Sequence, residues 1–122
     1  MTESTIQREI MLACSAAGDT IWRNNTGVAW QGSELRKQGR NMLIINARPV
    51  HFGLTKGSSD LIGIRPTIIT PEMVCQTVAV FLALEVKTPS GRVSAAQKTF
   101  LAHVNAAGGL ARVVRGVGDI PG

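Results

Sequence analysis

Two acidic residues of this chain lie beside apolar stretches. Asp60 ends a Gly/Ser-rich turn and precedes the apolar run Leu61–Ile64, and Glu85 follows the apolar run Thr77–Leu84. Lys87 lies two positions after Glu85, and because side chains alternate across a strand, we expect the carboxylate and the ammonium to share a face. Carboxylate pairs that leave room for water and phosphate suit Mg²⁺ or Mn²⁺. A neighbouring lysine can orient a water molecule, so the pattern predicts metal-assisted phosphodiester chemistry.

A structural interpretation of the same residues stays open at this point. Glu85 and Lys87 could form a solvent-facing ion pair on a strand, and Asp60 could simply complete a turn. A Glu-x-Lys spacing alone is a weak signal. The apolar run Thr77–Leu84 predicts a central strand that is covered on both faces, and this context raises the weight of the site.

A helix is predicted from about Thr5 to Ala17, with one apolar stripe and a capping box formed by Ser4 and Gln7. Glu9 lies at the edge of that stripe and is expected to face partly inward. An inward acid needs a partner or a metal, but a boundary glutamate paired with a basic neighbour is the alternative.

A second helix is predicted from Ser94 through about Ala107. The side chain of Gln97 falls on its inner stripe, and it could also bond back to Ser94 in a capping box. We expect one side chain not to fill both roles easily. The other members of the inner stripe are Phe100, Leu101 and Val104.

The middle of the chain is basic. Candidate strands at Thr20–Arg23 and Met42–Ile45 enclose a predicted loop, Trp30–Asn41, that would contact DNA. The net charge of +5 and the pI near 10.0 suit a polyanionic partner, although a solvated loop is the alternative. Trp22 and Trp30 could stack on bases, but a core position is favoured for a tryptophan near a strand. The clustered basic residues are Arg36, Lys37, Arg40, Arg48 and Lys56.

The length of 122 residues predicts one domain, residues 1–122, with its own core. No signal-peptide pattern opens the sequence, and the longest apolar run is too short to span a bilayer. The two cysteines have no metal-ligand spacing and suit a reducing compartment. We therefore expect a soluble, intracellular protein.

Taken together, the motifs resemble the VRR-NUC (virus-type replication-repair nuclease) branch of the PD-(D/E)XK nuclease superfamily. The resemblance implies an α/β, restriction-endonuclease-like fold with a central mixed β-sheet flanked by helices and an αβββαβ core. Ser59 stands where the superfamily pattern has a proline. The motifs are Asn25-Thr26-Gly27, Phe52-Gly53, Gly57-Ser58-Ser59-Asp60 with Leu61-Ile62-Gly63, Glu85-Val86-Lys87, and Gly91-Arg92-Val93-Ser94 with Gln97.

The resemblance also implies the roles of single residues. Asp60 and Glu85 would hold Mg²⁺ or Mn²⁺, the Val86 carbonyl would add a ligand, and Lys87 would position the attacking water. Glu9 and Gln97 match the helix-borne acidic and glutamine positions of the family, and the resemblance implies that both support the site. Arg36, Lys37, Arg40 and Lys56 are the expected DNA contacts.

The expected function is that of a metal-dependent, structure-selective DNA endonuclease. Small family members resemble dimeric junction-cleaving enzymes of phages or bacteria, so we expect a homodimer that acts on branched DNA such as four-way junctions. A place in DNA repair, in the cytoplasm of a bacterial or phage-infected cell, follows from the same resemblance. The alternatives are a flap or single-strand nuclease of the same fold, and a non-catalytic nucleic-acid-binding module.

Overall fold

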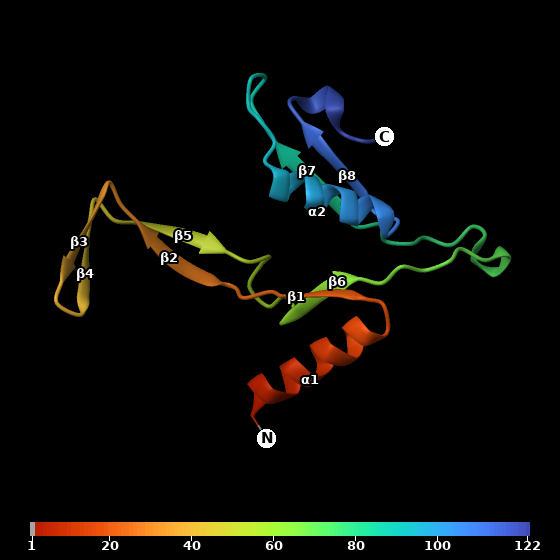
Figure 1. Cartoon of the computed structure of the whole chain (residues 1–122), viewed down its shortest axis with the longest axis horizontal. Helices are drawn as coiled ribbons and strands as arrows, with labels where there is room; N and C mark the ends of the chain where they lie inside the picture. Colours follow the sequence, from red (N-terminus) through yellow and green to blue (C-terminus); the bar gives the residue numbers. More distant parts are fainter. Residues whose placement is uncertain (1) are drawn as a thin grey trace. The chain divides into compact units, whose positions relative to one another are not determined.

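The computed structural model describes residues 2–122, which divide into two compact units. The first unit comprises the residues up to Ser15 together with Ile21–Gly63. The second comprises Ala16–Thr20 and Ile64–Gly122. Figure 1 labels the helices and strands of both units.

The first unit begins with helix α1 (Glu3–Ala16) and includes the two-stranded sheet of β1 (Thr20–Arg23) and β6 (Leu61–Ile64). The Arg23 guanidinium donates to Gln7 Oε1 over 3.0 Å, which links the strand to the helix. The predicted helix is confirmed, with a start that is two residues earlier than expected.

The predicted cap of α1 is wrong. The hydroxyl of Thr2 accepts the backbone amide of Thr5 over 3.2 Å, so Thr2 and not Ser4 satisfies a free amide of the first turn. Gln7 is thereby free to accept from Arg23. Thr2 and Ser4 are both good capping residues, and the residue at which the helix begins decides which of them is the cap.

Four strands of the first unit form a long β-ribbon, which we call the β-arm. Strand β2 (Gly27–Gln31) pairs antiparallel with β5 (Arg48–Phe52), and β3 (Glu34–Gln38) pairs antiparallel with β4 (Asn41–Ile45). The second ladder continues from the first, as Figure 1 shows. At their junction the Ser33 amide donates to the Ile45 carbonyl over 2.9 Å.

The β-arm corrects the prediction of a loop over Trp30–Asn41. That stretch holds the end of β2 and all of β3, and β3 turns back onto β4. The residues of β3 are polar or charged except Leu35, so the apolar alternation that identifies a half-buried strand is missing. Both faces of β3 are exposed, which explains why a polar sequence is tolerated there.

The second unit is built on a parallel β-α-β motif. Strand β7 (Leu82–Val86) pairs parallel with β8 (Leu110–Val114), and helix α2 (Ala95–Ala106) connects them and packs on both. Parallel neighbours need a crossover connection, and the helix supplies it. Val104 is a residue of α2 and is fully buried, and it lies at the centre of the small core.

Two predictions about this unit need correction. The strand expected over Thr77–Leu84 begins only at Leu82, and the preceding Val78 and Val80 are exposed. Strand β8 begins only at Leu110, whose parallel partner is Leu82, so the earlier apolar residues lie outside that ladder. Phe100, expected on the inner face of α2, is also exposed, whereas Val104 is buried as predicted.

The α/β class is confirmed. The described strands pair in four two-stranded sheets, of which the β2–β5 and β3–β4 sheets are antiparallel and the β7–β8 sheet is parallel, in place of one continuous central sheet. Short 3-10 helices at Pro71–Met73 and Val117–Asp119 complete the described elements. None of the described helices combines the length and the apolar character that crossing a membrane requires.

Candidate functional site

Glu85 and Lys87 lie on one face at the end of β7, as their spacing predicts. The Lys87 ammonium is 3.5 Å from Glu85 Oε1, and the two side chains are 21% and 29% exposed. Lys87 directly follows the strand, and its backbone amide donates to the Val114 carbonyl of β8 over 3.0 Å. The pair is thus partly shielded from water and fixed by the parallel ladder. This partial burial distinguishes the pair from a fully exposed surface ion pair.

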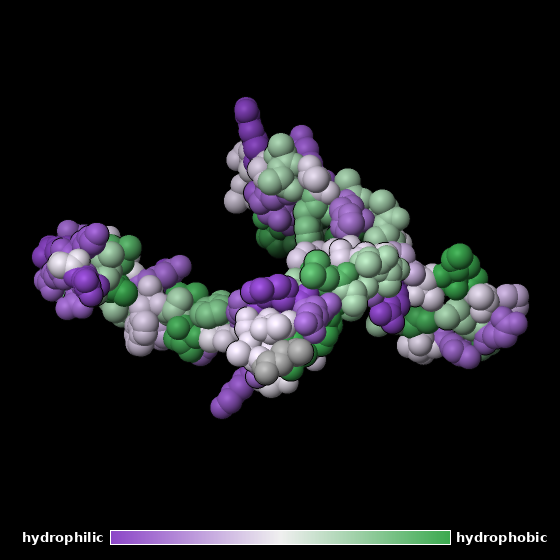
Figure 2. Space-filling model, turned by 60° about the horizontal axis from the view of Figure 1, so that its bottom comes forward, coloured by the Kyte–Doolittle hydropathy of each residue, from purple (hydrophilic) through white to green (hydrophobic). Residues whose placement is uncertain are grey.

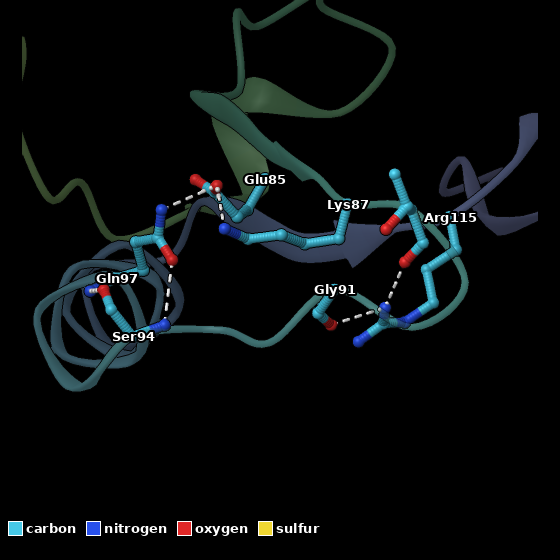
Figure 3. Close-up of polar contacts among 7 residues, drawn as sticks. Glu85, Lys87, Gly91, Ser94, Gln97 and Arg115 are labelled. Carbon is cyan, nitrogen blue, oxygen red and sulfur yellow. Dashed lines mark hydrogen bonds and ion pairs between the residues drawn. The ribbon is translucent and has the colours of Figure 1, made fainter.

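Gln97 joins this pair from α2 (Figure 3). Its Nε2 donates to Glu85 Oε1 over 2.8 Å. Its Oε1 accepts the Ser94 backbone amide over 2.9 Å, and the Gln97 amide in turn donates to the Ser94 hydroxyl over 3.1 Å. The capping box is therefore confirmed, and the expectation that one side chain could not fill both roles is wrong. The two ends of a carboxamide have opposite hydrogen-bonding character, so each role uses a different end.

The backbone of Val86 is directed away from β8. Successive residues of a strand direct their amide and carbonyl groups to opposite edges, and the neighbouring Lys87 amide is bonded to β8. The Val86 carbonyl therefore points to the other edge of β7. This is the direction that a carbonyl must have to be available as a ligand.

Arg115, which follows β8, forms hydrogen bonds with the turn after Lys87. Arg115 Nη1 donates to the carbonyls of Thr88, Pro89 and Gly91 over 2.6, 3.3 and 2.8 Å. The Arg115 backbone amide donates to the Asp119 carboxylate over 2.8 Å. Because this turn leads from Lys87 to the cap of α2, the arginine braces the connection between the two parts of the site (Figure 3).

Asp60 belongs to the first unit, where its side chain is exposed and forms no hydrogen bond or ion pair with any described residue. Its backbone carbonyl accepts the Asn24 amide over 2.8 Å. The Asn24 side chain is bonded to the segment that precedes Asp60, namely to Leu54, Ser58 and Ser59. Asp60 is therefore placed by its backbone, and its carboxylate stays available.

Two of the motifs quoted above come together in this unit. Gly27 pairs with Phe52 across the β2–β5 ladder, and a Cβ added at Gly27 would lie 2.8 Å from the Phe52 ring. A Cβ at Gly53 would lie 2.5 Å from the Asn25 carbonyl. The Asn-Thr-Gly and Phe-Gly motifs are thus one packed corner, from which the segment 54–60 departs.

Glu9 differs from expectation. It is exposed on α1 in the first unit, and it forms no ion pair or hydrogen bond within residues 2–122. The helix packs too little of its surface in this unit to turn the edge of the stripe inward, since even Ile6 and Ile10 are exposed. Within the first unit, Glu9 therefore faces solvent and not inward.

Oxygen atoms that could bind a divalent ion occur at individual described residues and not in a cluster of acidic side chains. Over residues 2–122, no three of the His, Cys, Asp and Glu side chains gather into a metal cluster. Glu85 uses Oε1 for Gln97 and Lys87, and its second oxygen has no partner among the described residues. Free carboxylate oxygens at Asp60 and Glu85 and a directed carbonyl at Val86 fit a hard cation such as Mg²⁺ or Mn²⁺.

The cationic residues of the β-arm differ in how much charge they offer. The Arg36 guanidinium is engaged by both oxygens of Glu34 at 2.9 and 3.0 Å, and this hydrogen bonding raises the pKa of Arg36. Lys37 and Arg40 have no such partner among the described residues. Figure 2 shows hydrophilic residues gathered over the β3–β4 end of the arm, with hydrophobic residues beside them. Lys56 is exposed in the segment that leads to Asp60.

Trp30 is also a surface residue of the β-arm. It is 57% exposed, whereas Trp22 of β1 is half-buried. The core position favoured for Trp30 is therefore wrong, because the β2–β5 ladder is not covered on the face that carries it. An exposed indole beside a cationic ribbon can stack on a nucleobase.

The sequence did not predict the roles of two residues that position the site, Asn24 and Arg115. Asn24 directly follows the candidate strand Thr20–Arg23, and an asparagine at the end of a strand indicates no more than a turn. Arg115 belongs to none of the quoted motifs. Its three carbonyl partners lie 24 to 27 positions earlier in the chain, and no local pattern announces them.

Comparison with known proteins gives one match. The family model described as the VRR-NUC domain matches residues 23–118, which is most of the chain. The matched range includes Asp60, Glu85, Lys87 and Gln97, whereas Glu9 lies before it. No curated protein and no solved structure matches.

Proposed function

Because the chain belongs to the VRR-NUC family and carries its nuclease domain, we propose that it is a divalent-metal-dependent DNA endonuclease, with residues 1–122 as one catalytic domain. The observation that carries this proposal is the cluster of Glu85, Lys87 and Gln97, in which one carboxylate oxygen is fixed and the other has no described partner. A site built only for stability would gain more from using both oxygens.

Metal ligation in the proposal falls to Asp60, Glu85 and the Val86 carbonyl. A bound Mg²⁺ or Mn²⁺ supplies positive charge for the scissile phosphate and makes water a better nucleophile at neutral pH. The proposal requires both carboxylates to reach the same ion. Support comes from their free oxygens and from the family match, whose range includes both residues.

Lys87 orients the attacking water and offsets negative charge on the phosphate. Its ammonium has Glu85 on one side at 3.5 Å, which leaves donors for a water molecule or a phosphate oxygen. In the proposed reaction the water oxygen bonds to phosphorus as the bond to the 3′ oxygen breaks, with the proton passing to that oxygen. The products are a 5′-phosphate and a 3′-hydroxyl.

Gln97 positions Glu85 through its 2.8 Å hydrogen bond. Glu9 completes the proposed set only if α1 presents it to the site, because in the first unit it is solvent-exposed. Its contribution is the first to test by substitution, and Glu9→Gln is the conservative variant for that purpose.

The β-arm is the proposed DNA-binding element, together with Lys56. Its exposed cations and Trp30 offer charge for the phosphates and an aromatic face for bases. We further propose that the protein acts as a homodimer on branched DNA such as four-way junctions, in DNA repair in the cytoplasm of a bacterial or phage-infected cell. A two-fold dimer presents two sites to two strands.

The central test is cleavage of labelled linear, flap, fork and four-way DNA with Mg²⁺ or Mn²⁺. Asp60→Asn and Lys87→Ala are expected to lose activity by roughly a hundredfold or more while retaining fold and DNA binding. Glu72→Gln and Lys98→Ala are the matched controls, since they remove the same charges from exposed positions outside the site. Undiminished cleavage by Asp60→Asn or Lys87→Ala would refute the assignment.

The same substrate panel separates the alternatives. Preferential cutting of flaps or single strands would replace the junction preference. Salt-sensitive binding without metal-dependent turnover would indicate a non-catalytic binding module. A mass measurement in solution checks the dimer.

A further inference from the structure

Asn24 is the one buried polar side chain of the described chain, with 8% of its surface exposed. It lies directly after β1, next to Asn25, which is exposed. Burial of an amide is unfavourable unless its donors and acceptor are paired, so this position needs a reason.

Every polar group of Asn24 except its backbone carbonyl forms a hydrogen bond with the same segment, residues 54–60. Oδ1 accepts the Leu54 amide over 3.1 Å, and Nδ2 donates to the Ser58 hydroxyl over 2.7 Å and to the Ser59 carbonyl over 2.9 Å. The Asn24 backbone amide donates to the Asp60 carbonyl over 2.8 Å. One residue therefore contacts the beginning and the end of the segment 54–60.

The segment has little else to fix it. Within the segment, the Ser58 amide donates to the Thr55 carbonyl over 2.9 Å, and the Thr55 amide donates to the Ser58 hydroxyl over 3.4 Å. The Asp60 carboxylate has no described partner of its own. The direction of that carboxylate hence depends on a backbone that Asn24 holds.

We propose that Asn24 is a positioning residue for metal binding, which presents the Asp60 carboxylate by fixing the Ser59–Asp60 backbone. The inference rests on the proposed function, because it takes Asp60 as a metal ligand. Partners of metal-ligating side chains orient the ligand, and their loss typically weakens metal affinity 10- to 100-fold.

The required chemistry is specific to asparagine. The site needs one acceptor for the Leu54 amide and two donors for Ser58 and Ser59. Aspartate has the same shape and keeps the acceptor, but it has no donors and would place a carboxylate against the Ser59 carbonyl. Asn24→Asp therefore tests the donors without leaving a cavity.

The experiment measures Mn²⁺ binding by titration calorimetry and cleavage as a function of Mn²⁺ concentration. Asn24→Asp and Asn24→Ala are expected to bind Mn²⁺ about tenfold more weakly. They are expected to regain most of the cleavage rate when Mn²⁺ is raised, and hydrogen exchange of residues 54–60 should be faster than in the wild type. Asn25→Ala is the matched control and should leave the affinity unchanged.

Two further variants separate positioning from general destabilisation. Val104→Ala opens a cavity in the second unit and is expected to lower stability while retaining Mn²⁺ affinity. If Asn24→Ala fails to fold, Ser58→Ala is the milder variant: it removes one acceptor of Asn24 Nδ2, together with the 3.4 Å contact to the Thr55 amide, and should weaken Mn²⁺ binding by a factor of about three to ten.

The outcomes also separate this inference from the proposed function. Loss of Mn²⁺ binding in Asp60→Asn, with wild-type affinity in both Asn24 variants, would overturn the positioning role and leave the nuclease proposal intact. Wild-type affinity in Asp60→Asn would overturn the ligand assignment, and the inference with it.

Discussion

Gln97 donates its amide to Glu85 across 2.8 Å while the oxygen of the same carboxamide caps helix α2 at Ser94. The start of the helix and the carboxylate at the end of β7 are thus fixed by a single side chain. A helix cap is usually a matter of stability alone. Here it also decides where one proposed metal ligand lies.

Gln97→Glu is expected to separate the two roles. Glutamate caps a helix as well as glutamine does, so the free energy of unfolding should change by less than about 1 kcal/mol. The donor to Glu85 is replaced by a second carboxylate, and cleavage should fall by roughly tenfold or more. Gln97→Ala loses both roles and should also be less stable by about 1 kcal/mol. Wild-type cleavage by Gln97→Glu would contradict the positioning role; urea unfolding and the cleavage assay provide the two measurements.

Arg115→Ala removes the nitrogen that holds three carbonyls of the turn 88–91. We expect the free energy of unfolding to fall by about 1–3 kcal/mol and the cleavage rate to fall with it, because the turn connects Lys87 to the cap of α2. Since one nitrogen makes all three contacts, Arg115→Lys should recover part of both losses. Lys98→Ala controls for the loss of a positive charge. If Arg115→Lys loses as much stability and cleavage as Arg115→Ala, a single ammonium cannot replace the contacts, and the planar guanidinium itself is required.

Lys37→Ala should weaken DNA binding more than Arg36→Ala. Arg36 already faces both oxygens of Glu34, whereas Lys37 offers its charge to a phosphate without losing a partner. The slope of log affinity against log salt is expected to decrease by about one unit for Lys37→Ala and by less for Arg36→Ala. Fluorescence anisotropy at several salt concentrations measures both. Glu34→Gln is the informative companion, because it should release Arg36 and strengthen binding.

Gly53→Ala should be more destabilising than Gly57→Ala. Both glycines have a positive φ, at +81° and +86°, so each alanine carries a backbone cost of about 1 kcal/mol. Only at Gly53 would the added Cβ also crowd the Asn25 carbonyl, at 2.5 Å. Overpacking of that kind costs roughly 1–3 kcal/mol more. Thermal unfolding of the two variants gives the comparison, and equal losses would mean that the corner at Asn25 relaxes without cost.

Local periodicity and capping chemistry were enough to predict some of this arrangement. Glu85 and Lys87 share a face because the side-chain period of a strand is two, and the α2 cap follows from residues three positions apart. Pairing between distant segments is a different matter. The start of β8 at Leu110 determines that Thr77–Phe81 stays outside the β7 ladder, and the side-chain partners of Asn24 lie 30 to 35 positions away.

The β-arm shows the other limit of sequence reasoning. Strand β3 is polar on both faces, and its identity comes from backbone pairing with β4 and not from burial. Gly39 and the charged residues on either side of it are equally typical of a loop. What the sequence did predict there was the positive charge, which does not depend on secondary structure.

The alternation of the β-arm also constrains how its length can change. Lys37 shares a face with Leu35, Met42 and Ile44 through the register of the β3–β4 ladder. Insertion of one residue into each strand at the base of the arm would turn this face to the opposite side. Insertion of two per strand would restore it. Natural or engineered variants of the arm that keep the orientation of Lys37 should therefore differ in length by steps of two cross-strand pairs.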